Sequence, residues 1–318
     1  MWGGRRYYSL DFYLKETFGE KLYKLSLDGG MTCPNRDGKI SYGGCIFCSE
    51  GGSGDFAAPC EMNINQQIEY AKSLVSKKFD GNRYIAYFQS YTNTYAPVEY
   101  LRELFLPVIM REDIAVLSIA TRPDCLGDDV LELISELAKI KPVWVELGLQ
   151  TIHQKTAEFI NRGYDLECYN TTVRNLKKAG ASVITHIIIG LPYETREQII
   201  QTADYVGKSG ADGIKLQLLH VLKNTKLEEI YNSGEFNTLS EDEYVSLVAD
   251  IIAVLPENIV IHRLTGDGDK KILVSPLWSC NKRRVLNLIN HKLKEKNIIQ
   301  GKGLALVTNC DNKTEKLN

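Results

Sequence analysis

Three cysteines are the residues of this chain with the clearest capacity for chemistry. Cys33, Cys45 and Cys48 lie in the stretch CPNRDGKISYGGCIFC, with eleven residues between the first two and two between the last two. Cysteine thiolates are the usual ligands of iron–sulfur clusters, and three of them can hold three irons of a four-iron, four-sulfur cubane. The fourth iron would keep an open coordination position. The spacing therefore indicates a reactive cluster.

Other uses of these cysteines stay open at this point. A zinc site needs four ligands, commonly from two close pairs, and only Cys45 and Cys48 form such a pair. A fourth ligand would have to be a histidine or one of the other cysteines: Cys60, Cys125, Cys168, Cys280 or Cys310. A disulfide framework is disfavoured, because eight cysteines in 318 residues are sparse and no secretory signal precedes them.

Composition and charge place the chain among soluble globular proteins. Its 44% hydrophobic and 25% charged residues are ordinary values for that class. The N-terminus has no uninterrupted apolar core, and no apolar run approaches the roughly 18 residues of a membrane span. Free thiols and an oxygen-sensitive cluster fit a reducing compartment, so we expect a cytoplasmic location without membrane attachment.

The net charge of −2 hides a basic segment near the C-terminus. Between Lys270 and Lys302 the only acidic residue is Glu295, whereas nine lysines and arginines occur there. Trp278 and His291 are interleaved with them. Such a segment could bind a phosphate backbone, or it could be the solvated face of an amphipathic helix.

Strand-like and helix-like segments alternate along most of the chain. The expected strands are Leu22–Asp28, Tyr84–Gln89, Ala115–Thr121, Val143–Gln150, Ser182–Ile189 and Gly213–Val221. The expected helices are Ile64–Phe79, Val98–Met110, Asp128–Lys139, Tyr169–Ala179 and Arg196–Ser209. Short, continuously apolar strands are typical of a parallel sheet covered on both faces. Six units are too few for an eight-fold barrel, so the fold class predicted is α/β, an open partial (β/α)6 barrel.

The barrel is expected to occupy residues 22–222, after an N-terminal arm at 1–21. A small α+β extension with a short strand, Val260–Leu264, and a basic helix would fill 223–302, and 303–318 would form a frayed tail. In parallel βα barrels, functional groups gather at the C-terminal ends of the strands. The cysteine loop follows the first strand, and polar or glycine residues end four others: Gln89-Ser90, Thr121-Arg122, Gln150 and Gly190.

Several motifs resemble the radical S-adenosylmethionine (SAM) superfamily. The C-x11-C-x2-C spacing with Phe47 beside Cys48 carries the resemblance first. The stretches ATRPD, VELGLQTI, NRGY and IIIGLP look like the radical SAM half of the Elongator catalytic subunit. CPNRDG, FQSYTNTYAP and HRLTGDG look closer to its shorter bacterial relatives of the YtqA/YhcC type. The similarity spans about residues 20–300, with no counterpart of the Elongator acetyltransferase half.

The resemblance implies a [4Fe-4S] cluster on Cys33, Cys45 and Cys48, with SAM chelated to the open iron through its amino and carboxylate groups. An electron from the cluster would cleave the sulfonium bond and give a 5′-deoxyadenosyl radical that abstracts hydrogen from the substrate. Phe47 would lie near the adenine of SAM. Gln89, Ser90 and Thr92 stand where the superfamily usually has Gly-Gly-Glu for the amino group, so backbone carbonyls are expected to share that role.

The remaining SAM contacts are assigned in the same way. Thr121 and Gln150 are the candidates for the ribose, and Gly190 and Leu191 for close passage beside the adenine. Arg162 is the choice for the SAM carboxylate, because a guanidinium offers two parallel donors, with Arg122 as the rival. Residues expected to face the substrate or the open side of the barrel are Tyr91, Tyr95, His186, Lys215, Gln217, His220, His262, Arg263 and Asp267.

The resemblance also implies tRNA as the substrate, at carbon 5 of the wobble uridine. In the YtqA-like branch the expected step converts 5-carboxymethylaminomethyluridine towards 5-aminomethyluridine, before a partner tRNA methyltransferase acts. A flavodoxin or ferredoxin would supply electrons. Two rivals stay open: a radical SAM enzyme for a small metabolite or cofactor precursor, and a non-catalytic metal-binding tRNA adaptor.

Overall fold

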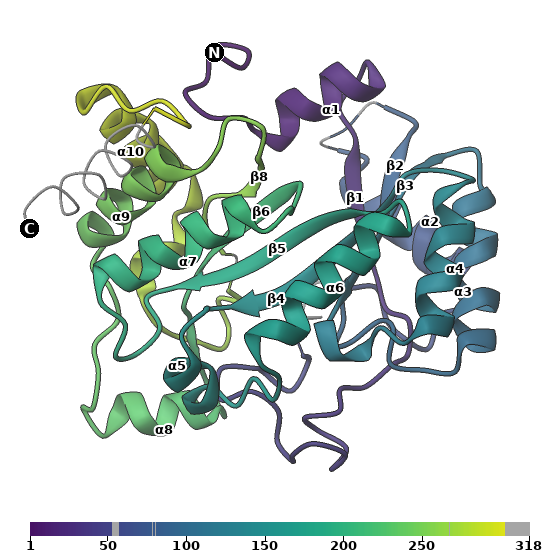
Figure 1. Cartoon of the computed structure of the whole chain (residues 1–318), viewed down its shortest axis with the longest axis horizontal. Coiled ribbons are helices and arrows are strands. Elements are labelled where there is room, and N and C mark those ends of the chain that lie inside the picture. Colours follow the sequence, from purple (N-terminus) through teal and green to yellow (C-terminus); the bar gives the residue numbers. More distant parts are fainter. Residues whose placement is uncertain (53–56, 78, 80, 267, 303–318) are drawn as a thin grey trace, which may run out of the picture.

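A seven-stranded parallel sheet, curved into an open barrel, forms the core of the protein (Figure 1). The computed structural model describes residues 1–52, 57–77, 79, 81–266 and 268–302. The strands run in the order β1-β2-β3-β4-β5-β6-β8. Their bounds are Tyr23–Leu27 (β1), Tyr84–Phe88 (β2), Ile114–Thr121 (β3), Val143–Gln150 (β4), Ser182–Ile189 (β5), Gly213–Leu218 (β6) and Val260–Arg263 (β8).

Helices between the strands cover the outer face of the sheet (Figure 1). They are α2 (Ile64–Val75), α3 (Val98–Met110), α4 (Asp128–Ala138), α6 (Leu166–Lys178) and α7 (Arg196–Lys208), with the short η1 (Pro123–Cys125) and α5 (Gln154–Phe159) in two of the loops. Each long helix turns an apolar stripe to the sheet, as α4 does with Val130, Leu133, Ile134 and Leu137. The partial barrel predicted from the alternating pattern is confirmed, with element bounds shifted by a few residues.

The C-terminal segment contributes the seventh strand. The short strand expected near Val260 is β8, and it pairs with β6 in parallel, Gly213 opposite Val260 and Ile214 opposite Ile261. A boundary near residue 223 therefore cuts through this sheet and does not separate two cores. The sequence pattern could not show this, because an isolated four-residue strand does not reveal its neighbour.

The rest of the C-terminal segment packs around the barrel. It contains α8 (Lys226–Asn232), α9 (Glu241–Val254), η2 (Leu277–Cys280) and α10 (Lys282–Glu295), and β7 (Val221–Leu222) pairs antiparallel with β9 (Leu273–Ser275). The basic helix α10 buries Val285, Ile289 and Leu293 and packs against α9, while Arg283 and Arg284 are exposed. The predicted tail, 303–318, lies outside the described residues.

Helix α1 (Leu10–Phe18) closes the N-terminal end of the barrel (Figure 1). Its Leu14 packs in a cluster with Leu22, Val116, Trp144 and Ile184, which lie at or near the N-terminal ends of the strands. The N-terminal arm is anchored to β8, because the Ile261 amide donates to the Tyr8 carbonyl at 2.7 Å. With one end of the barrel plugged by apolar side chains, the open end is the one at which the strands end.

Within the described part of the chain, every helix is too short or too polar to cross a lipid bilayer.

The closure by α1 can be tested by truncating its buried leucine. We expect Leu14→Ala to lower the free energy of unfolding by about 2–5 kcal/mol, since it leaves a cavity between α1 and the sheet. The matched control is Leu74→Ala in α2, a leucine that is 57% exposed. Urea unfolding of the two variants measures the difference, and equal losses would contradict the closure.

Candidate functional site

A cavity of about 430 Å³ opens at the C-terminal ends of the strands. The cysteine loop, residues 33–48, forms one wall with all three cysteines, and side chains from β1 to β6 and from β8 form the interior. Its volume lies within the range of small-molecule sites. The strand ends therefore converge on one site, as the barrel geometry predicted.

The cysteine loop is shaped by glycines and by its own backbone. Gly43 and Gly44 have φ angles of 81° and 86°, in the left-handed region that favours glycine. The Cys48 amide donates to the Cys45 carbonyl at 3.0 Å, which brings the two side chains to the same turn. Arg36 spans the loop, and its guanidinium donates to the carbonyl of Ser49. The positions of the cysteines are thus fixed by contacts within the protein.

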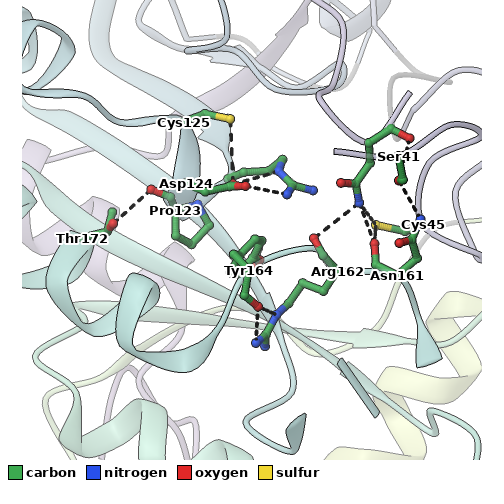
Figure 2. Close-up of polar contacts among 12 residues, drawn as sticks. Ser41, Cys45, Pro123, Asp124, Cys125, Asn161, Arg162, Tyr164 and Thr172 are labelled. Carbon is green, nitrogen blue, oxygen red and sulfur yellow. Dashed lines mark hydrogen bonds and ion pairs between the residues drawn. The ribbon is translucent and has the colours of Figure 1, made fainter. Parts of the chain in front are cut away.

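A second loop, residues 161–164, lies directly against the cysteine loop (Figure 2). The Asn161 amide nitrogen donates to the Gly44 carbonyl at 2.8 Å and to Ser41 Oγ at 2.9 Å. In return, the buried Asn35 amide donates to the Asn161 carbonyl at 2.6 Å and lies 3.6 Å from Cys45 Sγ. The NRGY motif therefore positions the cysteine loop.

The hydrogen bonds of the Arg162 guanidinium disfavour its predicted role as the ligand of the SAM carboxylate. Its side chain is buried, and its Nη1 donates to the carbonyls of Leu149 at 3.1 Å and Thr151 at 2.6 Å. Its Nε and Nη2 donate to the Tyr164 carbonyl at 3.0 and 2.8 Å (Figure 2). A guanidinium used by three backbone carbonyls stabilises the loop. It lines the cavity but has one N–H without a backbone partner, so it would have to give up at least one of those bonds to hold a SAM carboxylate with two donors.

The rival, Arg122, is also engaged. It makes two parallel hydrogen bonds to Asp124, at 2.9 and 2.7 Å. Burial opposes its charge, but the Asp124 carboxylate outweighs that effect and raises the pKa of Arg122. Arg122 lies 5.0 Å from the centre of the Tyr164 ring and lines the cavity. Asp124 takes the Nε–Nη2 edge of the guanidinium, so a ligand would meet its other edge.

The three cysteines fit an iron–sulfur cluster. A hydrogen bond with Cys48, followed by burial, raises the pKa of the Cys45 thiol well above its usual range. Thiolates crowded in this way repel one another, and binding to iron removes that repulsion. Among the residues that the structure describes, no three His, Cys, Asp or Glu side chains converge on the position of a single metal ion. Three cysteines of one loop that reach the same cavity are the ligand set of a cluster with one open iron.

Most of the other predicted site residues line this cavity. They are Phe47, Gln89, Tyr91, Thr92, Thr121, Gln150, Lys215, Gln217, His220 and Arg263, with His186. Five predicted residues lie elsewhere: Ser90, Tyr95, Gly190, Leu191 and His262. Leu191 packs in an apolar cluster with Ile160 and Leu219, and the His262 ring lies 5.1 Å from Trp144, deeper in the barrel. Asp267 lies outside the described residues.

Polar side chains at the inner end of the cavity form a group that we call the ionic floor. It consists of Lys24, Tyr87, Ser118, Glu146, His186 and Lys215. Sequence reasoning predicted His186 and Lys215 as site residues but missed the other four. The Glu146 carboxylate is its centre: it accepts from Lys24 Nζ at 2.6 Å, Ser118 Oγ at 2.9 Å and His186 Nε2 at 2.8 Å, and it pairs with Lys215. Lys215 Nζ also donates to Tyr87 Oη at 3.2 Å.

Burial and mutual charge shift these groups strongly. Burial alone would raise the pKa of Glu146, but Lys215 and Lys24 outweigh it and hold that pKa well below its usual range. Burial lowers the pKa of Lys215 well below its usual range, despite Glu146, and Lys24 and Arg263 add to this effect. Burial and the charge of Lys215 lower the pKa of His186 to about 4. The carboxylate is thus ionised and the imidazole neutral at pH 7.

A signal for the ionic floor was present in the sequence. Glu146 stands alone in the apolar strand VWVELGLQ, and Lys215 stands in GIKLQL. A charged residue in a strand buried on both faces must find partners, because an isolated buried charge is very costly. That rule identifies Glu146 and Lys215 as unusual, but it does not predict that they pair with each other.

The basic helix does not border the cavity. Figure 1 shows α10 on the opposite side of the molecule from the cysteine loop. Part of its charge is also neutralised locally, since Arg284 pairs with Glu241 at 2.8 Å and Lys292 with Glu295 at 2.8 Å. Binding of a phosphate backbone by this helix stays a prediction.

Comparisons with known proteins agree with the site. The family model described as the radical SAM superfamily matches residues 33–206, and the radical SAM C-terminal domain model matches residues 211–295. The Bacillus subtilis protein YtqA is 47% identical over 94% of this chain and 92% of its own length. The tRNA uridine(34) acetyltransferase of Methanocaldococcus jannaschii is 27% identical over 58% of this chain and 34% of its own length.

A solved structure shares the fold. The archaeal Methanocaldococcus infernus Elp3, with an N-terminal deletion, superposes with a TM-score of 0.66 at 17% identity. The match covers 88% of this chain and 64% of that one.

The support of the cysteine loop can be tested at Asn161. We expect Asn161→Ala to weaken iron–sulfur cluster binding by about 10–100-fold, the usual effect of losing a group that orients a metal ligand. Asn161 has a φ of 57°, so a control must share that strain; Asn297→Ala, at φ 50° just after α10, does so. Cluster absorbance during anaerobic treatment with a chelator measures the effect. Equal cluster loss in both variants would assign it to backbone strain.

The neutral state of His186 makes stability depend on pH. An unfolded histidine titrates near 6.5, whereas His186 in the fold titrates at about 4. The unfolded chain therefore binds one proton more between these values, so stability falls as the pH drops from 6.5 to 4, by up to about 1.4 kcal/mol per pH unit. We expect His186→Gln to flatten this slope and the exposed His291→Gln to leave it unchanged. Urea unfolding at several pH values measures it, and an identical slope in His186→Gln would refute the assignment.

Proposed function

The chain belongs to the radical SAM superfamily, and we propose that it modifies the carbon-5 side chain of the wobble uridine in tRNA. The specific reaction proposed is a two-electron oxidation of 5-carboxymethylaminomethyluridine at the methylene beside its carboxylate, followed by hydrolysis of the resulting C=N bond to 5-aminomethyluridine and glyoxylate. SAM, cleaved to methionine and 5′-deoxyadenosine, would be the oxidant. The observation that carries the proposal is a single cavity that joins three cysteines at its rim to the ionic floor at its inner end. Such a cavity can hold a cofactor and a polar substrate group together.

The residues of the rim would hold the cofactors. Radical SAM enzymes use a [4Fe-4S] cluster and SAM, and the bound pair supplies a 5′-deoxyadenosyl radical that abstracts hydrogen. Cys33, Cys45 and Cys48 would ligate the cluster. The predicted SAM residues that line the same cavity, Phe47 and Gln150 among them, remain the candidates for its adenine and ribose. The cysteine loop and residues 161–164 would keep this wall rigid.

The choice of tRNA is supported by relatives. The similarity to a tRNA uridine(34) acetyltransferase covers 58% of this chain but only 34% of that protein, so it supports a shared substrate more than a shared reaction. Enzymes that act on a single base need it unstacked, and an anticodon loop presents unstacked bases. The methylene groups of the modification are the proposed sites of hydrogen abstraction.

The proposal includes three further expectations. A flavodoxin or ferredoxin would deliver the electron, a tRNA methyltransferase would use the product, and the enzyme would work in the cytoplasm.

A deletion experiment tests the substrate. In a host that makes 5-carboxymethylaminomethyluridine, we expect tRNA from cells lacking this protein to accumulate that nucleoside and to lose 5-aminomethyluridine and its methylated product. Mass spectrometry of digested tRNA measures both, and restoring the gene with Cys33→Ala should not rescue the change. Unchanged wobble nucleosides would refute the proposal. Formation of 5′-deoxyadenosine without any effect of tRNA would favour a small-molecule substrate.

A further inference from the structure

The ionic floor holds more positive than negative groups in direct contact. Glu146 is its single carboxylate, while Lys24 and Lys215 are both within ion-pair distance of that carboxylate. His186 is neutral, and burial and Glu146 raise the pKa of Tyr87 well above its usual range, so neither adds charge at pH 7. Lys24 and Lys215 therefore share one carboxylate, and the nearby Arg263, which also lines the cavity, adds to the positive potential. Burial lowers the pKa of Lys215, so a second carboxylate beside it would stabilise its protonated form.

Lys215 is the member of the floor best placed to meet a ligand. It is 3% exposed, yet it lines the cavity together with Glu146 and His186. An ammonium carries three N–H groups, and within the described chain two of them have partners, Glu146 and Tyr87 Oη. One N–H is left for a group in the cavity. Both lysines lie over the Tyr87 ring, with Nζ 4.3 Å from its centre for Lys24 and 4.5 Å for Lys215, but Lys24 is not among the residues that line the cavity.

We infer that the ionic floor binds a carboxylate of the substrate, with Lys215 as the cation in contact with it. The inference rests on the proposed function, whose substrate ends in a carboxylate. The negative charge of that carboxylate would offset the excess positive charge of Lys24, Lys215 and the neighbouring Arg263. The buried setting makes the pairing selective, because a cation or an apolar group would leave the second lysine unpaired.

The same floor would favour release of the product. The substrate already carries the amine, so the proposed product differs from it by loss of the carboxylate. The ammonium of the product would then stand near Lys215 without the negative charge that offset both cations, which raises the free energy of the complex. The floor thus distinguishes substrate from product by the presence of one negative charge.

The test is equilibrium binding of synthetic anticodon stem-loops to the anaerobic holoprotein without SAM, so that no turnover occurs. One stem-loop carries 5-carboxymethylaminomethyluridine and the other its carboxamide, which has the same shape but no charge. We expect the wild type to bind the carboxylate at least about tenfold tighter, the usual value of a hydrogen bond to a charged group. Lys215→Met should bring the ratio near one. Lys208→Met, which removes a lysine whose side chain is 61% exposed, should preserve it.

A second variant, expected to change the binding ratio in the opposite direction, distinguishes loss of the site from misfolding. Glu146→Gln removes the competing carboxylate, so it should increase the preference for the charged stem-loop, a gain that damage to the fold cannot produce. A wild-type ratio near one, with conversion of the modified stem-loop still occurring when SAM is added, overturns the carboxylate site alone. Absence of both binding and conversion overturns the proposed function and this inference together.

Discussion

A carboxylate buried inside a barrel must be paired with positive or hydrogen-bonding groups. Glu146 is paired by side chains from four other strands of the sheet. Lys24 comes from β1, Ser118 from β3, His186 from β5 and Lys215 from β6. Removing one partner from such an arrangement commonly costs about 3–5 kcal/mol, because the remaining charge stays buried. The same contacts that hold the strands in register around Glu146 also define the inner end of the cavity.

The two ends of the barrel have opposite character because one of them is plugged. Leu14 and Trp144 close the N-terminal end with apolar surface, so polar groups inside the barrel have access to ligands only through the other end. There the cysteine loop meets residues 161–164 through Asn35 and Asn161. Cofactor ligands at the rim and charged groups at the inner end therefore face one shared space.

The contribution of the C-terminal segment is structural at this site. Strand β8 completes the sheet beside β6 and brings Arg263 to the cavity, where it donates to Gln217 at 3.2 Å. Helix α10 packs against α9, far from the cysteine loop. The lysines and arginines of this helix suggested a binding role, but the helix lies away from the cavity and does not line it.

Sequence patterns alone determined the features that are local in the chain. The spacing of Cys33, Cys45 and Cys48 indicated a cluster, and the apolar runs predicted the six strands before residue 223 within a few residues, because burial on both faces of a sheet leaves a direct trace in composition. Only the tertiary structure decided which polar groups meet. Asn35 and Asn161 are 126 residues apart, and Lys24 and Glu146 are 122 apart. A charged or amide residue within an apolar stretch of sequence indicates that it needs a partner. Which residue becomes that partner depends on how the strands curve around the barrel, and a short stretch of sequence does not contain that information.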